Sequence, residues 1–220
     1  MTYLISLHLQ NRTCLVVGGG KIATRKIRDL LTEGANVTVI SPQISPQIPL
    51  SQITHIADGY QSEYLHQIAP FLVFAATNQP DVNRQIVSDA QNYGVLVNSV
   101  DGHNIGDFDN VMQIEKSPLT IGISTGGASP ALGVHLRDEI ADVIGEAYPL
   151  LATWLGELRP QLKHAVEDHH TRHAFWHSVL QSDVLPLLKV GKQKEAHAHL
   201  QAQFKQVVDD ANAIAEATQS

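Results

Sequence analysis

Cysteine is nearly absent from this chain of 220 residues, and long apolar runs are absent altogether. The single cysteine, Cys14, excludes a disulfide within one chain, and its place in an apolar run predicts a small buried side chain. No apolar stretch approaches the roughly 18 residues that a membrane-spanning helix needs. Residues 1–9 lack the basic start and the small-residue cleavage site of a secretion signal. We therefore expect a cytoplasmic protein that does not enter a membrane.

Positively charged residues are also few. The chain has 15 Lys and Arg residues and 22 Asp and Glu residues, which gives a formal net charge of −7. General binding to nucleic acid is therefore not expected, and an anionic substrate would need a local positive patch. The apolar content of 43% supplies a core for one large domain, or for a compact domain with an appendage.

A glycine turn joins a predicted strand at residues 13–17 to a predicted helix at residues 21–33. Its spacing is that of Gly-x-Gly-x-x-Gly/Ala. The first glycine permits a sharp turn, the second lets backbone N–H groups approach a pyrophosphate, and the small third residue lets the helix pack closely on the sheet. The alternative is a tight turn without a ligand. The residues predicted to bind a dinucleotide here are Gly18, Gly19, Gly20, Lys21, Ile22 and Ala23.

The second predicted strand, residues 36–40, ends in Ser41, where an NAD-binding turn usually carries Asp or Glu for the ribose hydroxyls. Ser41 offers a weaker hydroxyl contact, so spacing alone leaves the choice between NAD and NADP open. Lys21, Arg25 and Lys26 could attract anionic groups, but solvent-facing side chains are the expected reading for all three.

Short apolar runs and helical stretches alternate as far as residue 101. Further strands are expected at residues 54–57, 71–75 and 95–98, a helix at 80–93, a loop at 42–52, and an edge strand or lead-in at 4–9. This alternation predicts a doubly wound, Rossmann-like parallel sheet, whose ligands bind beyond the carboxyl ends of its strands. Those ends carry Thr77 and Asn78, which we assign to the dinucleotide, and also Asn98 and Asp101.

The pattern changes after residue 110. Residues 102–110 are polar and irregular, strands are expected at 111–115 and 119–124, and a helix at 130–144 begins with Ser129 as N-cap and Pro130 as first residue. About three more helices are expected from residue 148, divided at Pro160 and near Gly191. We expect a dinucleotide-binding domain at residues 1–110, a small α+β dimerisation and substrate segment at 111–145, and a helical domain at 146–220.

Two constellations could carry chemistry. Asp101 could act as a general base that takes a proton while a hydride leaves for nicotinamide, could hold a cation, or could simply form a turn before Gly102. The small and hydroxyl residues of 124–130, at a helix N-terminus, suit a substrate carboxylate or are an ordinary capped helix.

Histidines recur near the C-terminus, at His164, His169, His170, His173 and His177. Three of them share one helix face at a spacing of four residues. No acidic partner completes a known zinc pattern such as His-Glu-x-x-His, so we expect a solvated or packing face and no metal site.

An ordered set of motifs resembles the precorrin-2 dehydrogenase/sirohydrochlorin ferrochelatase family, which forms the N-terminal module of siroheme synthase. The resemblance covers about residues 3–145. Its motifs lie at residues 18–26, 76–78, 97–101, 117–119 and 123–132.

The resemblance implies NAD-dependent oxidation of precorrin-2 to sirohydrochlorin in siroheme biosynthesis, followed in some members by Fe²⁺ insertion. It implies a homodimer, with the segment 111–144 at the interface. The family's important aspartate matches Asp101, and its phosphorylatable serine falls on Thr125. The alternative function is a dinucleotide-sensing module that regulates a partner without catalysis. The residues assigned to the tetrapyrrole are Asn98, Ser124, Thr125, Gly126 and Gly127.

Overall fold

The computed structural model describes residues 3–102 and 105–218. Two compact units are present, Met1–Asn110 (unit 1) and Val111–Ser220 (unit 2), and each is described by itself. Residues 103 and 104, expected to be irregular, lie outside the described residues. The separate domain expected to end at residue 145 stays a prediction.

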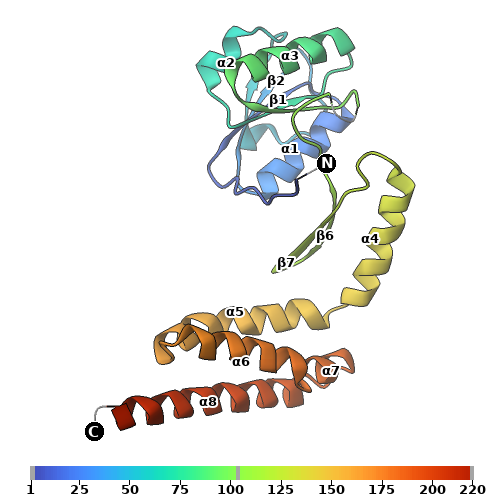
Figure 1. Ribbon diagram of the computed structural model, residues 1–220. Helices are drawn as coiled ribbons and strands as arrows, with labels where there is room; N and C mark the ends of the chain where they lie inside the picture. Colours follow the sequence, from blue (N-terminus) through green and yellow to red (C-terminus); the bar gives the residue numbers. More distant parts are fainter. Residues whose placement is uncertain (1–2, 103–104, 219–220) are drawn as a thin grey trace. The chain divides into compact units, whose positions relative to one another are not determined.

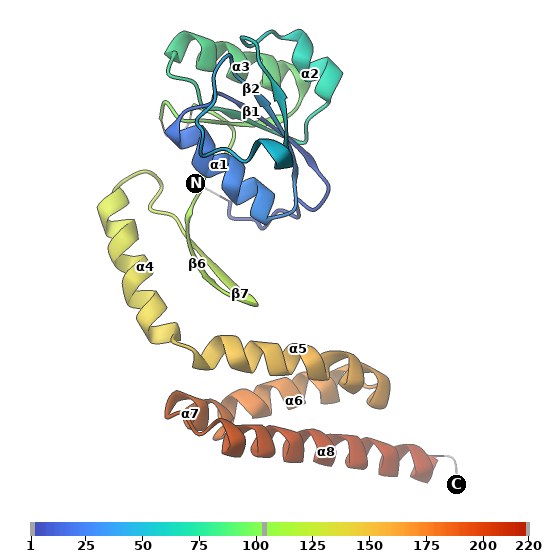
Figure 2. The ribbon, with the colours of Figure 1, turned by 180° about the vertical axis from the view of Figure 1, so that it is seen from behind.

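Unit 1 is a parallel sheet with the strand order β3-β2-β1-β4-β5. Figures 1 and 2 show α1 on one face of this sheet and α2 and α3 on the other. The doubly wound parallel sheet expected from the sequence is thereby confirmed. The strands are β1 (Thr13–Val17), β2 (Asn36–Ile40), β3 (Ile53–Ile56), β4 (Leu72–Ala75) and β5 (Leu96–Ser99), and the helices are α1 (Lys21–Thr32), the 3₁₀ turn η1 (Leu50–Gln52), α2 (Glu63–Ile68) and α3 (Pro80–Tyr93).

Alternate residues of the central strand β1 enter two different cores. Cys14 and Val16 pack in the cluster that includes Ile27 of α1, whereas Leu15 packs in the cluster that includes Ile86 of α3. Because helices cover both faces, this strand is a continuous apolar run without polar alternation. That continuity is the reason it could be recognised from the sequence.

The structure of unit 1 differs from the remaining expectations only in detail. Helix α2 was not predicted, because its six residues are too few to show helical periodicity. Residues 4–9 form a lead-in and no strand. Leu7 and Leu9 in that lead-in pack against the α1 side of the core.

Unit 2 begins with an antiparallel hairpin and continues as helices. The hairpin pairs β6 (Met112–Lys116) with β7 (Leu119–Ile123), and α4 (Pro130–Ile144) follows, with Ser129 Oγ accepting a hydrogen bond from Leu132 N as expected of an N-cap. The last four helices are α5 (Ala147–Ala165), α6 (His169–Gln181), α7 (Val184–Lys189) and α8 (Gln193–Thr218). None of the described helices is both long and apolar enough to cross a membrane.

The expected division at Pro160 is wrong, because Pro160 lies inside α5. A proline removes one helical hydrogen bond and crowds the preceding turn, but Leu158 and Leu162 on either side are both buried in the helical core. Packing on both sides of the proline therefore holds the helix together, and α5 ends only at Ala165.

The buried Cys14 thiol is a chemical reporter of the sheet. Burial raises the pKa of this thiol from 9.0 to about 11, and its side chain is fully shielded from solvent. We expect the native protein to resist a thiol reagent such as DTNB at pH 8, and the protein in guanidinium to release one equivalent per chain. Rapid stoichiometric labelling of the native protein would contradict this placement.

Candidate functional site

Parallel strands bring four predicted ligand-binding segments to one edge of unit 1. Strand β1 lies between β2 and β4, and β4 pairs with β5, all in parallel. The carboxyl ends of these strands therefore lie side by side, and the segments that follow them share the edge. The glycine turn follows β1, Ser41 follows β2, Thr77 and Asn78 follow β4, and Asp101 follows β5.

Two of the three glycines are required by close backbone contacts. A Cβ at Gly18, whose φ is +123°, would lie 2.2 Å from the carbonyl oxygen of Ala76. A Cβ at Gly19 would lie 2.1 Å from the carbonyl oxygen of Gln43. Both glycines therefore let the turn pack tightly against neighbouring strand ends, whether or not a ligand is present.

Gly20 is different, because nothing lies within 4 Å of the Cβ position there. It is the N-cap of α1, and no side chain caps that helix. The first N–H groups of α1 consequently lack a side-chain acceptor, which suits an anion such as a pyrophosphate. The chain thus fits a dinucleotide at the glycine turn.

The three residues after Gly20 differ in their exposure to solvent. Lys21 is exposed and the Ile22 side chain is 45% exposed, so both are accessible beside the anion site. Ala23 is fully buried and packs α1 on the sheet. Its predicted contribution to cofactor binding is therefore made through helix placement.

Ser41 is buried, and its hydroxyl donates to the carbonyl oxygen of Gln43 at 2.6 Å. The carbonyl oxygen of Ser41 is 2.9 Å from His55 Nε2. These contacts shape the loop that packs on Gly19. A ribose contact by Ser41 stays a prediction.

Thr77, Asn83 and Asp101 form one hydrogen-bonded group. Asn83, on α3, is fully buried. Its Oδ1 accepts from Thr77 N at 3.1 Å and from Thr77 Oγ1 at 2.7 Å. Its Nδ2 donates to Thr77 O at 3.1 Å and to Asp101 Oδ2 at 3.0 Å. The predicted catalytic carboxylate is thus tied to the predicted cofactor-binding turn.

Asn83 was not predicted as a site residue from the sequence. A signal was present, because Asn83 lies on the buried face of α3 with Ile86, Val87 and Ala90. A polar amide among apolar positions on a helix requires buried hydrogen-bond partners. What those partners are could not be known without the fold.

Asn98 is buried, and its Nδ2 donates to Phe108 O at 2.8 Å. The same segment is held by Asp107, whose Oδ2 accepts from Val97 N at 3.0 Å. The Asn98 amide N–H is therefore engaged within unit 1. The assignment of Asn98 to the substrate stays a prediction.

The expectation that Lys26 faces solvent is wrong. Its side chain is buried, and Nζ donates to Asn110 Oδ1 at 2.6 Å and lies 5.6 Å from the ring centroid of Phe74. Lys26 belongs to the face of α1 that contains Ala23 and Ile27, which packs on the sheet. Burial lowers the pKa of Lys26 from 10.5 to about 8.

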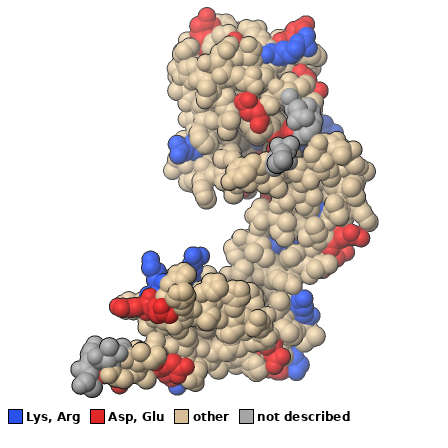
Figure 3. All heavy atoms as spheres, viewed as in Figure 1, with Lys and Arg blue, Asp and Glu red and all other residues tan. Residues whose placement is uncertain are grey.

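Charged side chains are scattered over the face that Figure 3 draws. On the face drawn in Figure 3, the described Lys, Arg, Asp and Glu residues are interspersed among many uncharged ones. At the glycine turn, the N–H groups of the first turn of α1, which no side chain caps, remain the candidate for anion recognition.

The second glycine turn lies in unit 2. Ser124 Oγ accepts from Gly126 N at 3.1 Å, and Thr125 Oγ1 accepts from Ser129 N at 3.3 Å. Gly126 and Gly127 have φ values of +60° and +80°, which explains two adjacent glycines. The structure describes a capped helix start here, and its use by a substrate stays a prediction.

Histidine rings follow one another along α6, with centroids 6.4 Å apart for His169 and His173 and 4.4 Å apart for His173 and His177. In the described part of the chain, no three His, Cys, Asp or Glu side chains gather where they could hold one metal ion.

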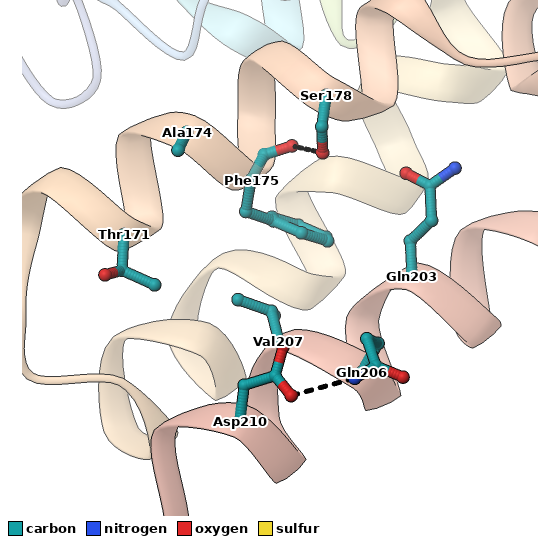
Figure 4. A pocket seen from close by; sticks show the side chains of 8 residues that line it. All are labelled: Thr171, Ala174, Phe175, Ser178, Gln203, Gln206, Val207 and Asp210. Atoms are coloured by element: carbon teal, nitrogen blue, oxygen red, sulfur yellow. Dashed lines mark hydrogen bonds between the residues drawn. The ribbon is translucent and has the colours of Figure 1, made fainter. Parts of the chain in front are cut away.

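A cavity of about 420 Å³ lies elsewhere in unit 2. Figure 4 shows Phe175 of α6 facing Val207 of α8, with Gln203 at one end. Gln203 Oε1 is buried and accepts no hydrogen bond from the described residues. No residue assigned to a ligand from the sequence lines this cavity.

Three family models match the chain in succession. An NAD(P)-binding model matches residues 5–110, a model described as "Sirohaem biosynthesis protein central" matches 116–142, and one described as "Sirohaem synthase dimerisation region" matches 147–204.

Curated relatives share about a third of their aligned residues with this chain. The siroheme synthase of Nitrosomonas europaea is 34% identical over 215 residues, which are 95% of this chain and 45% of that protein. The siroheme synthase of Methylobacillus flagellatus is 35% identical over 204 residues, 91% of this chain and 43% of that protein. The chain therefore spans less than half the length of these relatives.

A solved structure described as "SirC, precorrin-2 dehydrogenase" is similar over its full length. The TM-score is 0.73 at 28% identity, and the alignment covers 91% of this chain and 100% of that one. The similarity extends through both units.

Substitution of Gly20 should separate folding from cofactor binding. In Gly20→Asp the new side chain enters open space and can cap α1, so we expect an unchanged or raised Tm. Its carboxylate would repel a pyrophosphate, so NAD⁺ affinity should fall at least about tenfold, or 1.4 kcal/mol. Calorimetric titration and thermal melts measure both. Gly156→Asp, at an exposed glycine with open space in unit 2, is the charge control and should bind normally.

The buried Lys26 should make stability depend on pH. The folded state releases this proton near pH 8 and the unfolded state near 10.5, so the contribution of Lys26 to stability rises with pH from about 8. Above pH 9 the raised pKa of Cys14 acts in the opposite direction, and between pH 8 and 9 the Lys26 contribution to the free energy of unfolding is about 1 kcal/mol. In Lys26→Met this rise should disappear, as measured by urea unfolding from pH 7 to 9. An unchanged rise would show that another group is responsible.

Proposed function

The chain belongs to the siroheme synthase family, whose successive family models it matches, and on that premise we propose that it is an NAD-dependent precorrin-2 dehydrogenase. The reaction converts precorrin-2 to sirohydrochlorin. The observation that carries the proposal is the exposed carboxylate of Asp101 at the same sheet edge as the open anion site beside Gly20. Similarity to a precorrin-2 dehydrogenase over that protein's full length supports it.

The reaction requires one hydride acceptor and one base. NAD⁺, when bound, accepts the hydride. Asp101 takes the proton, because its carboxylate is exposed while Oδ2 is anchored by Asn83. The N-terminus of α1 binds the pyrophosphate, and Gly18 and Gly19 keep the turn close to the strand ends. Thr77 and Asn78 complete the cofactor edge, with Ser41 at the ribose.

Precorrin-2 carries several carboxylates, so its binding calls for groups that favour anions. We assign this role to Asn98 and to the unit 2 turn formed by Ser124, Thr125, Gly126 and Gly127. The backbone N–H groups at the start of α4 follow that turn, and Ser129 caps only one of them.

A homodimer is part of the proposal, supported by the dimerisation-region model at residues 147–204. Insertion of Fe²⁺ into sirohydrochlorin is a further reaction that we propose to test in this protein. It displaces two pyrrole protons, for which Asp101 is again the available base. A cytoplasmic location stays a prediction.

The direct assay is anaerobic mixing of the protein with precorrin-2 and NAD⁺, followed by Fe²⁺. We expect NADH absorbance to rise together with the sirohydrochlorin spectrum, and siroheme formation above the rate without enzyme would add the chelatase. NAD⁺ binding without NADH formation, with NADP⁺ also inactive, would instead favour a dinucleotide-sensing module.

Replacement of Asp101 tests the proposed base. Asp101→Ala should bind NAD⁺ normally and lose dehydrogenase rate by about 10²- to 10⁴-fold, because general-base catalysis contributes in that range. Asp29→Ala, which removes an exposed carboxylate from α1, is the matched control and should retain full rate. A folded Asp101→Ala protein with the wild-type rate would refute the assignment.

A further inference from the structure

Asn83 is a fully buried amide whose four hydrogen bonds all go to two residues of the sheet edge. Two are accepted from Thr77, one is donated to Thr77, and one is donated to Asp101. Both lone pairs of Oδ1 and both hydrogens of Nδ2 are thereby used. Such complete use of a buried amide fixes its rotamer and leaves it no alternative partners.

The orientation of the amide follows from backbone chemistry. Thr77 N–H can only donate, and Thr77 C=O can only accept. Oδ1 of Asn83 must therefore face Thr77 N, and Nδ2 must face Thr77 O, at 3.1 Å each. With the amide held in this way, its second N–H points at Asp101 Oδ2, 3.0 Å away. The backbone N–H and C=O of Thr77 thus fix the amide orientation in which an N–H of Asn83 donates to Asp101.

We propose that Asn83 is the positioning residue for Asp101 in the dehydrogenase reaction, a role that rests on the function proposed above. The buried amide holds Oδ2 of an otherwise exposed carboxylate and leaves Oδ1 toward the reacting proton. Because the same amide holds Thr77, the base and the cofactor-binding turn keep a fixed relation. A base that is misplaced by even about 1 Å can lose a factor on the order of a hundred in rate.

The substitution Asn83→Asp keeps the acceptor of this side chain and removes its donors. Oδ1 can still accept from Thr77 N and Thr77 Oγ1, so two of the three hydrogen bonds to Thr77 are retained, while the donor to Thr77 O is lost. The donor toward Asp101 becomes a carboxylate oxygen about 3 Å from Oδ2, and like charges at that distance repel. We expect kcat to fall between about tenfold and a hundredfold, with the Kd for NAD⁺ within about twofold of wild type. The KM for precorrin-2 should change less than kcat.

The matched control is Asn92→Asp, the same chemical change at an exposed position of the same helix α3. It should leave kcat, KM and NAD⁺ affinity unchanged. Wild-type kcat in Asn83→Asp would overturn the proposal. So would a fall in kcat that only follows a matching loss of NAD⁺ affinity, because Asn83 would then act through Thr77 alone.

An exchanged pair, Asn83→Asp with Asp101→Asn, tests the coupling without using turnover. The amide at position 101 can now donate to the carboxylate at position 83, while Thr77 O still lacks its donor, so we expect part of the Tm lost in Asn83→Asp to return. The exchanged protein should still be inactive, because the base has moved. Each single variant and the exchanged pair form a double-mutant cycle.

The outcomes separate this proposal from the proposed function. If the wild-type protein does not oxidise precorrin-2, the proposed function is overturned. The double-mutant cycle still measures the coupling between positions 83 and 101. If Asn83→Asp does not fold but the exchanged pair does, rescue supports the coupling. If the exchanged pair is no more stable than Asn83→Asp, or does not fold, Asn83 serves the fold itself and the positioning role is overturned.

Discussion

The site depends on the close approach of the turn after β1 to the ends of its two neighbouring strands. Gly18 packs against the carbonyl of Ala76 after β4, and Gly19 against the carbonyl of Gln43 after β2, with no room for a Cβ at either position. This backbone contact holds three strand exits together. A side chain there would push the turn away from the strand ends, and the anion site at Gly20 would move with it.

Polar side chains then stabilise what the glycines bring together. Asn83 connects the exits of β4 and β5 through Thr77 and Asp101. Asn98 and Lys26 bond to Phe108 and Asn110 in the segment that ends unit 1. Each of these buried groups has its partner within the unit, since an unpaired polar group would cost about 1–3 kcal/mol. At the same edge, the side chain of Asp101 stays exposed.

Much of the fold could be predicted from local pattern. The bounds of β1, β2, α3 and α4 agree with expectation, because apolar runs, glycine C-caps and the Ser129-Pro130 start are local signals. Pro160 shows the limit of such signals. Its effect on a helix is normally disruptive, but burial of Leu158 and Leu162 prevails, and burial is decided by segments distant in the sequence.

The candidate site, too, could be predicted from the sequence only in part. The sequence by itself determined the glycine turn, the parallel order of strands and helices, and the presence of Asp101 after a strand, because each depends on neighbouring residues and their periodicity. Only the tertiary structure decided that Asn83 holds Asp101, 18 residues away, and that Lys26 bonds Asn110, 84 residues away. Pairing of such side chains requires the sheet and helices to be packed first, since no local pattern specifies which buried polar groups will meet.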